Sequence, residues 1–135
     1  MIPYMLDTNT CIHLIKRLPD PMRKRLSSLS VDKVGISSIV AAELWYGVAL
    51  SQKKKQNEIA LSDFLNYVVV LDWPFDASPI YAKIRATLKK KGTPIGAMDL
   101  LIASHAVFLN AVLVTDNTRE FQRVPDLKIE NWLNG

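Results

Sequence analysis

The sequence predicts an α/β fold, a three-layer α/β/α sandwich built on a parallel sheet of four or five strands. Short apolar runs without polar alternation recur along the chain, and helical patterns separate them. Strands of this kind are covered on both faces, and strands joined through helices lie parallel. The 135 residues are enough for a core of their own, so we expect a single domain over 1–135.

The first half of the chain alternates strand and helix patterns. Residues 3–6 form an apolar run that ends at Asp7, and Thr8–Ile15 places apolar side chains near one helical face. Three further elements are predicted: a short helix opening at Asp20 and ending near Leu29, a strand over 34–36, and a helix over 39–46 that Ser37 or Ser38 caps and Gly47 ends.

The second half repeats this alternation. An amphipathic helix is indicated by apolar residues at i, i+3, i+4 and i+7, namely Leu61, Phe64, Leu65 and Val68. A buried strand is expected over 68–71, and a helix from Ser78 and Pro79 that stops at Gly92. The remaining elements are a buried helix over 100–109, a strand over 111–115 and an edge strand over 127–132.

Composition narrows the classes of function. The net charge of +4 permits a polyanionic partner without requiring one. Basic residues cluster at 16–17, 23–25, 53–55 and 83–91, and such runs more often face solvent than RNA. No apolar run approaches the ~18 residues that span a bilayer, so we expect no membrane segment. The single cysteine, Cys11, excludes an internal disulfide and favours the cytosol.

Four carboxylates lie in or next to segments that the pattern predicts to be buried. Asp7 and Asp116 each follow a predicted strand, at the carboxyl edge where open α/β sheets bind ligands. Glu43 interrupts an otherwise uncharged helix, and Asp99 opens the buried helix. Buried carboxylates are costly unless paired or bound to metal, and converging ones repel and require a cation.

This set of acids predicts a metal site. All four ligands are hard oxygens, without a thiolate or imidazole cluster, and such sites suit Mg²⁺ or Mn²⁺ rather than zinc. Acidic clusters that hold divalent ions are a standard solution for phosphodiester hydrolysis, since the metal activates water and stabilises the leaving oxygen. Asn9, Thr115 and Asn117 are candidates for positioning that water or a carboxylate.

Each acid also has a purely structural interpretation. Asp7, Asp99 and Asp116 each lie where a carboxylate caps or complements a helix N-terminus, while Glu43 has no capping role and needs a basic partner. The remaining polar and aromatic candidates are assigned to structure: His13 and His105 as structural or surface residues, Cys11 as core, and Trp45, Trp73 and Trp132 as core or interface.

Four segments together resemble a known family, the PIN-domain ribonuclease toxins of VapC type. They are MLDTNTCIHLIK, SSIVAAELWYG, KGTPIGAMDLLIASHA and LVTDNTREFQRVPDLKIENW, in order over essentially the whole chain. The resemblance implies a PIN-like domain and Mg²⁺- or Mn²⁺-dependent endonucleolytic cleavage of RNA. Asp7, Glu43 and Asp99 match the three core acids of the family, and Asp116 matches a more variable fourth position. Asn9 and Thr115 match accessory polar positions.

The resemblance also implies partners. The family supplies the toxin of a toxin–antitoxin pair, and a VapB-type antitoxin lays a C-terminal segment, often with an Arg, into the acidic groove. Homodimers are usual, promoter DNA is bound only through the antitoxin, and the protein is expected in the cytoplasm. The subgroup with these motifs cleaves initiator tRNA in the anticodon loop, which makes tRNA the expected substrate here.

Two other functions fit parts of the pattern. A phosphatase of haloacid-dehalogenase type needs Asp-x-Asp-x-Thr after its first strand, and residues 7–10 come near, but Asn9 replaces the second Asp. A receiver-like binding module has similar length and layering, but it needs a paired acid beside Asp7 and a phosphorylatable Asp after a middle strand. Neither alternative explains Glu43.

Overall fold

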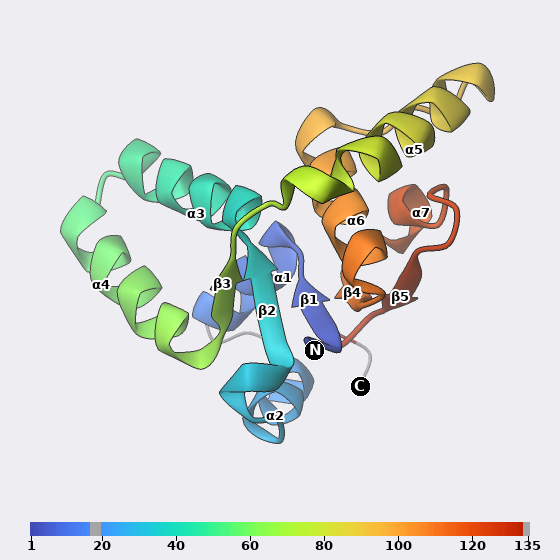
Figure 1. The fold of residues 1–135 in the computed structure, drawn as a ribbon. Helices are drawn as coiled ribbons and strands as arrows, with labels where there is room; N and C mark the ends of the chain where they lie inside the picture. The colour runs from blue at the N-terminus through green and yellow to red at the C-terminus, as the bar shows by residue number, and fades with distance from the viewer. Residues whose placement is uncertain (17–19, 134–135) are drawn as a thin grey trace.

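Five parallel strands form one sheet, as the sequence predicted, and the structure gives their order as β3-β2-β1-β4-β5 (Figure 1). The computed structural model describes residues 1–16 and 20–133. The strands are β1 (Tyr4–Leu6), β2 (Val34–Ser37), β3 (Val69–Leu71), β4 (Val112–Val114) and β5 (Lys128–Glu130). Arg17, part of one basic cluster, lies outside the described residues.

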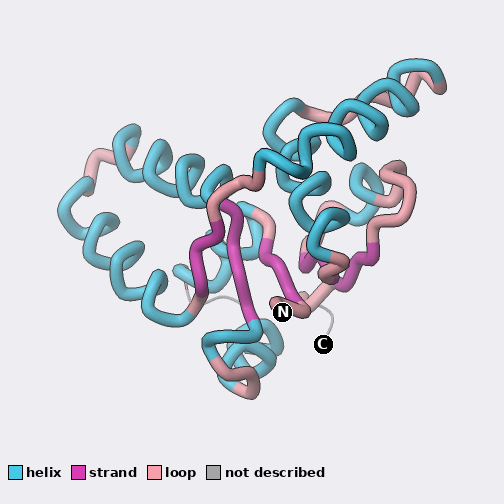
Figure 2. Tube along the Cα trace, in the orientation of Figure 1, coloured by secondary structure: helices cyan, strands magenta, loops and turns pink. Residues whose placement is uncertain are grey.

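Helices make up most of the connections between the strands (Figure 2). They are α1 (Thr8–Ile15), α2 (Asp20–Ser27), α3 (Ser38–Leu50), α4 (Lys54–Phe64), α5 (Ser78–Lys90), α6 (Ala97–Leu109) and α7 (Thr118–Phe121). In Figure 1, α1 lies behind the sheet and α6 in front of it, so helices cover both faces. Over 1–16 and 20–133, no helix is both long enough and apolar enough to span a bilayer.

The core lies between the sheet and these helices. Met5 and Leu6 of β1 and Ile36 of β2 are fully buried, because helices cover both faces of the central strands. Cys11 of α1 and Ile102 of α6 are equally buried, which confirms the core assignment of the cysteine. Each large apolar side chain buried in this way contributes about 1.5–3 kcal/mol, and these contacts fix the sheet that carries the site.

Two sequence-based predictions about these elements were wrong. Helix α3 does not end at Gly47 but continues to Leu50, and Gly47 lies in its interior with open space around its Cα. A glycine inside a helix costs only about 1 kcal/mol, which neighbouring turns outweigh. Strand β3 is not a buried strand but the edge of the sheet, and its Val70 is 43% exposed.

A contact made by Arg25 ties α2 to the strands. The Arg25 guanidinium lies 5.7 Å from the centre of the Tyr4 ring and 5.4 Å from that of Trp132, and the two rings meet edge to face. Arg25 donates to the Tyr4 hydroxyl at 3.2 Å and approaches Glu130 at 3.4 Å. The planar cation therefore links α2 with residues in or next to β1 and β5.

We expect Arg25→Ala to lower the free energy of unfolding by roughly 1–2 kcal/mol, because both ring contacts and the bond to Tyr4 are lost. Chemical denaturation measures the change. Lys24→Ala, on the same exposed helix, is the matched control and should be close to neutral. An equal effect of the two substitutions would contradict a specific role for Arg25.

The histidine of α6 is part of the core. His105 is 1% exposed, and its Nδ1 atom is buried without a hydrogen-bond partner among the described residues. Burial lowers the pKa of His105 because it disfavours the charged imidazolium. The unfolded chain binds a proton below about pH 6.5 that the folded protein does not, so this residue destabilises the fold as the pH falls.

We expect His105→Gln to reduce the loss of stability between pH 7 and pH 5 by up to about 1.4 kcal/mol per pH unit. Other groups titrate in both proteins, so the informative quantity is the difference between the wild-type and variant unfolding free energies at each pH. A difference that does not change with pH would show that the pKa of His105 is not lowered by folding.

Candidate active site

Two of the four acids meet at the junction of β1 and β4. These strands are neighbours, with Leu6 paired to Val114, so the residues that follow them lie at the same edge of the sheet. The Asp7 backbone N–H donates to Val114 O at 3.1 Å. Asp116 comes two residues after β4. The predicted placement of both acids at the carboxyl edge is therefore confirmed.

Asp7 is held on both of its oxygens. One accepts from the Thr10 backbone N–H at 2.9 Å, which caps α1, and the other accepts from the Thr115 hydroxyl at 2.5 Å. The side chain is only 4% exposed. Burial raises the pKa of Asp7 above its usual value, and the charge of Asp116 adds to this, while the hydrogen bonds act against it. Asp7 thus both caps a helix and belongs to the acidic site.

Glu43 lies in the middle of α3, and its side chain faces α1. Its Oε1 accepts a hydrogen bond from the Thr8 hydroxyl at 2.5 Å. The structural alternative for Glu43 was a buried pair with a basic residue, and no lysine or arginine of the described residues forms one. Glu43 also lines a groove of about 280 Å³ between α1, α3 and α4.

The pKa of Asp99 is affected by the charges of other acids in the site. It lies in the first turn of α6, and its pKa is raised to about 7 by burial and then by the charges of Glu120, Glu43 and Asp7. Carboxylates from four separate segments are therefore within electrostatic reach. Gly96 lies next to two of these acids, since a Cβ there would be 3.7 Å from Asp99 Oδ2 and 4.0 Å from Glu120 Oε1.

Glu120 is a fifth acid that the sequence analysis missed. Its carboxylate accepts from the Gly96 backbone N–H at 3.2 Å and from the Asn117 side chain at 3.1 Å. Burial raises the pKa of Glu120, but these hydrogen bonds outweigh it, so the pKa is lowered and the residue stays charged beside Asp99. Its position three residues after Asn117, the cap of α7, was the available signal, since that spacing brings a cap residue and a glutamate together.

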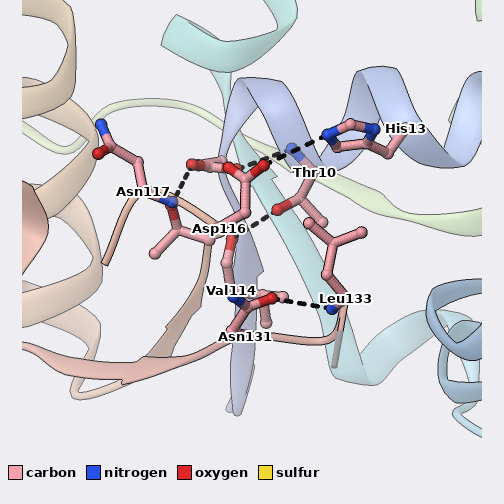
Figure 3. Close-up of polar contacts among 9 residues, drawn as sticks. Thr10, His13, Val114, Asp116, Asn117, Asn131 and Leu133 are labelled. Atoms are coloured by element: carbon pink, nitrogen blue, oxygen red, sulfur yellow. Dashed lines mark hydrogen bonds and ion pairs between the residues drawn. The ribbon is translucent and has the colours of Figure 1, made fainter. Parts of the chain in front are cut away.

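Asp116 contacts a histidine that the sequence analysis had set aside. His13 Nε2 lies 3.3 Å from Asp116 Oδ2, and Figure 3 shows the imidazole of α1 pointing toward this carboxylate. The assignment of His13 to structure or surface therefore left out its place at the site. Asp116 does not cap α7, because Asn117 occupies the cap position.

The accessory polar residues divide into two kinds. Thr115 bonds Asp7 and also accepts from the Asn117 backbone N–H at 2.9 Å, so it links the two ends of the site. Asn117 in turn holds Glu120. Asn9 lies exposed in the first turn of α1. Thr115 and Asn117 thus orient carboxylates, as the sequence suggested for accessory positions.

The donor set fits a hard divalent cation. All five acids offer carboxylate oxygens, and the raised pKa of Asp99 reports a repulsion that a cation would relieve. As the side chains stand in the described part of the chain, no three His, Cys, Asp or Glu residues are close enough together to hold one ion. The electrostatics therefore favour a cation, and ligation needs side-chain adjustment.

Known proteins are similar in sequence over nearly the whole length of this chain. The PIN domain family matches residues 4–127. Ribonuclease VapC2 of Rickettsia felis is 47% identical over 130 residues, covering 96% of this chain and 97% of that protein. The tRNA(fMet)-specific endonuclease VapC of Salmonella typhimurium is 42% identical over 132 residues, covering 98% and 99%. These matches exclude the phosphatase and receiver alternatives.

The fold agrees with a solved complex. The crystal structure of VapBC2 from Rickettsia felis bound to a DNA fragment from its promoter contains a chain that superposes with a TM-score of 0.91 at 46% identity, covering 98% of this chain and 99% of that one. Sequence and fold lead to the same group, and this chain belongs to the PIN-domain family and, within it, to the VapC ribonucleases.

Proposed function

We propose that this protein is a divalent-metal-dependent endoribonuclease that acts as the toxin of a VapBC toxin–antitoxin pair. The observation that carries the proposal is the raised pKa of Asp99, which burial raises first and which the charges of Glu120, Glu43 and Asp7, from three other segments, raise further. A cluster of acids that repel one another at the carboxyl edge of a parallel sheet is suited to a cation and a phosphodiester. Family membership supports the same activity.

The cofactor we propose is Mg²⁺, with Mn²⁺ as an alternative. Asp7, Glu43, Asp99 and Asp116 are the residues that would hold it. When bound, such an ion lowers the pKa of a water molecule and stabilises the charge that develops on the phosphate. Threonines orient these acids, since the Thr115 hydroxyl donates to Asp7 and the Thr8 hydroxyl to Glu43.

Glu120 acts on Asp99 and on the loop before it. Its hydrogen bonds from Gly96 and Asn117 bring the loop that precedes α6 against the segment that follows β4. Its charge is the largest electrostatic cause of the raised pKa of Asp99. Glu120 therefore adds a negative charge to those of the four predicted acids, and a bound cation would offset more repulsion than it would without Glu120.

RNA is the substrate that the charge distribution favours. Without the four predicted acids, nine carboxylates remain against 17 lysines and arginines, so the rest of the chain is strongly basic. The exposed Lys89 and Lys90 lie in the last turn of α5. We take tRNA as the substrate, and initiator tRNA in particular, because the Salmonella typhimurium relative is named as tRNA(fMet)-specific. The anticodon loop is the cut site that we propose from the family resemblance.

A VapB-type antitoxin is the proposed partner. The groove between α1, α3 and α4 is mainly apolar, with Ile12, Leu44 and Leu61 among its lining residues, and Glu43 and Lys16 add one negative and one positive charge. An antitoxin segment with apolar side chains would complement it, with an arginine directed at Glu43. VapBC2 of Rickettsia felis has been solved bound to a fragment of promoter DNA, and we propose that here promoter DNA is bound only through the antitoxin.

A homodimer in the cytoplasm completes the proposal. Tyr46 is 65% exposed and Leu50 67%, and their i, i+4 spacing on α3 places these two apolar side chains next to each other, which favours a protein partner there. The cytoplasm is where tRNA and the translation machinery are found.

We expect Asp7→Asn and Asp99→Asn each to lower RNA cleavage roughly 100-fold or more, because each removes a charged oxygen ligand. The measurement is single-turnover cleavage of bacterial tRNA with Mg²⁺ or Mn²⁺, with an arm that contains chelator. Asp32→Asn, an exposed acid that bonds Ser30, is the matched control and should retain full activity.

The same preparations test the alternative chemistry and the toxin role. A wild-type protein that leaves RNA intact but hydrolyses a simple phosphomonoester would contradict the nuclease proposal. Expression of wild type should arrest growth, co-expression of the antitoxin should relieve the arrest, and the Asp7 and Asp99 variants should not arrest growth.

We expect the affinity for Mn²⁺ to fall as the pH decreases through about 7, because Asp99 then takes up a proton and competes with the ion. Glu120→Gln should move this midpoint to lower pH, since removing a neighbouring negative charge lowers the pKa of Asp99. Titration calorimetry between pH 5.5 and 8 measures both proteins. Glu58→Gln, an exposed glutamate on α4, is the control, and an unmoved midpoint in Glu120→Gln would refute the coupling.

A further inference from the structure

Asp7 and Asp116 follow neighbouring strands, but they are held in different ways. Asp7 is fixed by a backbone N–H and by a hydroxyl. Asp116 lies on a bend outside regular structure, and the side chain found within hydrogen-bond distance of it among residues 1–16 and 20–133 is His13. A side chain on a bend samples several rotamers unless a contact selects one.

Helix α1 supplies the groups that hold both carboxylates. Thr10 gives its backbone N–H to Asp7 and its hydroxyl to Val114 O at 3.1 Å, two residues before Asp116. His13 follows Thr10 by three residues, so both side chains lie on adjacent turns of one helical face. Figure 3 shows Thr10 and His13 on the same side of α1, facing the end of β4. The helix is therefore anchored to β4 just beside the His13–Asp116 contact.

The contact leaves part of Asp116 free for the site. His13 approaches Oδ2, and the two side chains are 35% and 26% exposed, so water competes for the contact only in part. Asp7 and Asp116 follow the neighbouring strands β1 and β4, and the Asp7 backbone N–H bonds Val114 O, so the two acids lie at the same edge of the sheet. An imidazole N–H that bonds one oxygen of a carboxylate orients the other oxygen toward a metal.

We propose that His13 is a positioning residue for Asp116. Its Nε2–H donates to Oδ2 and turns the remaining oxygen toward the ion or the water held by the acidic site. The proposal rests on the proposed function, because it assigns His13 a role in that same metal site. Helix α1 would then have two roles, because the same rigid helix is capped by Asp7 and holds Asp116 through His13. It would thereby set the spacing between Asp7 and Asp116.

A double-mutant cycle tests the proposal with wild type, His13→Leu, Asp116→Ala and the double variant, together with His13→Gln. Leucine fills a similar space without a donor, whereas the glutamine amide still donates. Mn²⁺ affinity is measured by titration calorimetry without RNA, and kcat and KM are measured on tRNA. Thermal unfolding followed by circular dichroism confirms that each variant is folded.

We expect His13→Leu to weaken Mn²⁺ binding and lower kcat by about 10-fold each, within the range for residues that orient metal ligands, with KM little changed. His13→Gln should recover most of both losses. In the Asp116→Ala background, His13→Leu should have no further effect on either quantity, because the residue it positions is absent.

Three results would overturn the proposal. His13→Leu without effect on either quantity would show that the contact does not matter. An equal loss in the Asp116→Ala background would show that His13 binds the ion or RNA by itself. A His13→Gln variant as impaired as His13→Leu would exclude a donor role.

The cycle also separates this proposal from the nuclease proposal. If wild type binds Mn²⁺ but cleaves no RNA, the proposed function fails, while the metal-affinity cycle still decides the role of His13. If wild type binds no Mn²⁺, both proposals fail.

Discussion

The site depends on the pairing of β1 with β4. These strands are consecutive in the sheet but more than a hundred residues apart in the sequence, and their register places Leu6 opposite Val114. The Asp7 backbone N–H continues the ladder to Val114 O, and the Thr115 hydroxyl bonds the Asp7 carboxylate. A shift of one residue in this register would turn Asp7 to the opposite face of the sheet and separate it from Thr115. The buried apolar side chains of the two strands hold the register, so the hydrophobic core determines the geometry of the polar site.

Placing five acids together costs free energy, and the fold offsets that cost locally. Four of the five carboxylates have hydrogen-bond partners: threonine hydroxyls for Asp7 and Glu43, backbone N–H groups for Asp7 and Glu120, and the His13 imidazole for Asp116. Such donors stabilise the charged form without cancelling the charge. The pKa of Asp99 is raised to about 7, first by its burial and then by the charges of its acidic neighbours. Because the acids keep their negative charge, a cation gains from binding here, and a polyanion can then approach a site that its own charge would otherwise repel.

Structural roles and proposed functional roles fall on the same residues. Asp7 is the N-cap of α1, which confirms its capping interpretation, and it also lies in the acidic site, where a catalytic role is the one we propose for it. Asp99 lies in the first turn of α6, where the helix dipole favours a negative charge, and is also the acid most perturbed by its neighbours. The alternatives that the sequence left open for these residues were not exclusive, because a helix N-terminus at the carboxyl edge of a sheet both needs a carboxylate and presents it to a ligand.

The sequence by itself determined the fold class and the order of strands and helices along the chain. It also identified Asp99 and three acids whose charges raise the pKa of a neighbouring aspartate, namely Asp7, Glu43 and Asp116. Apolar runs and helical spacing are local patterns, and the helix predicted over Thr8–Ile15 was found with those bounds. Only the tertiary structure decided that β3 lies at the edge of the sheet, that Glu120 reaches Gly96, and that His13 meets Asp116. The reason is physical: His13 and Asp116 are 103 residues apart, and whether they touch depends on strand order and register, which the packing of the whole core sets.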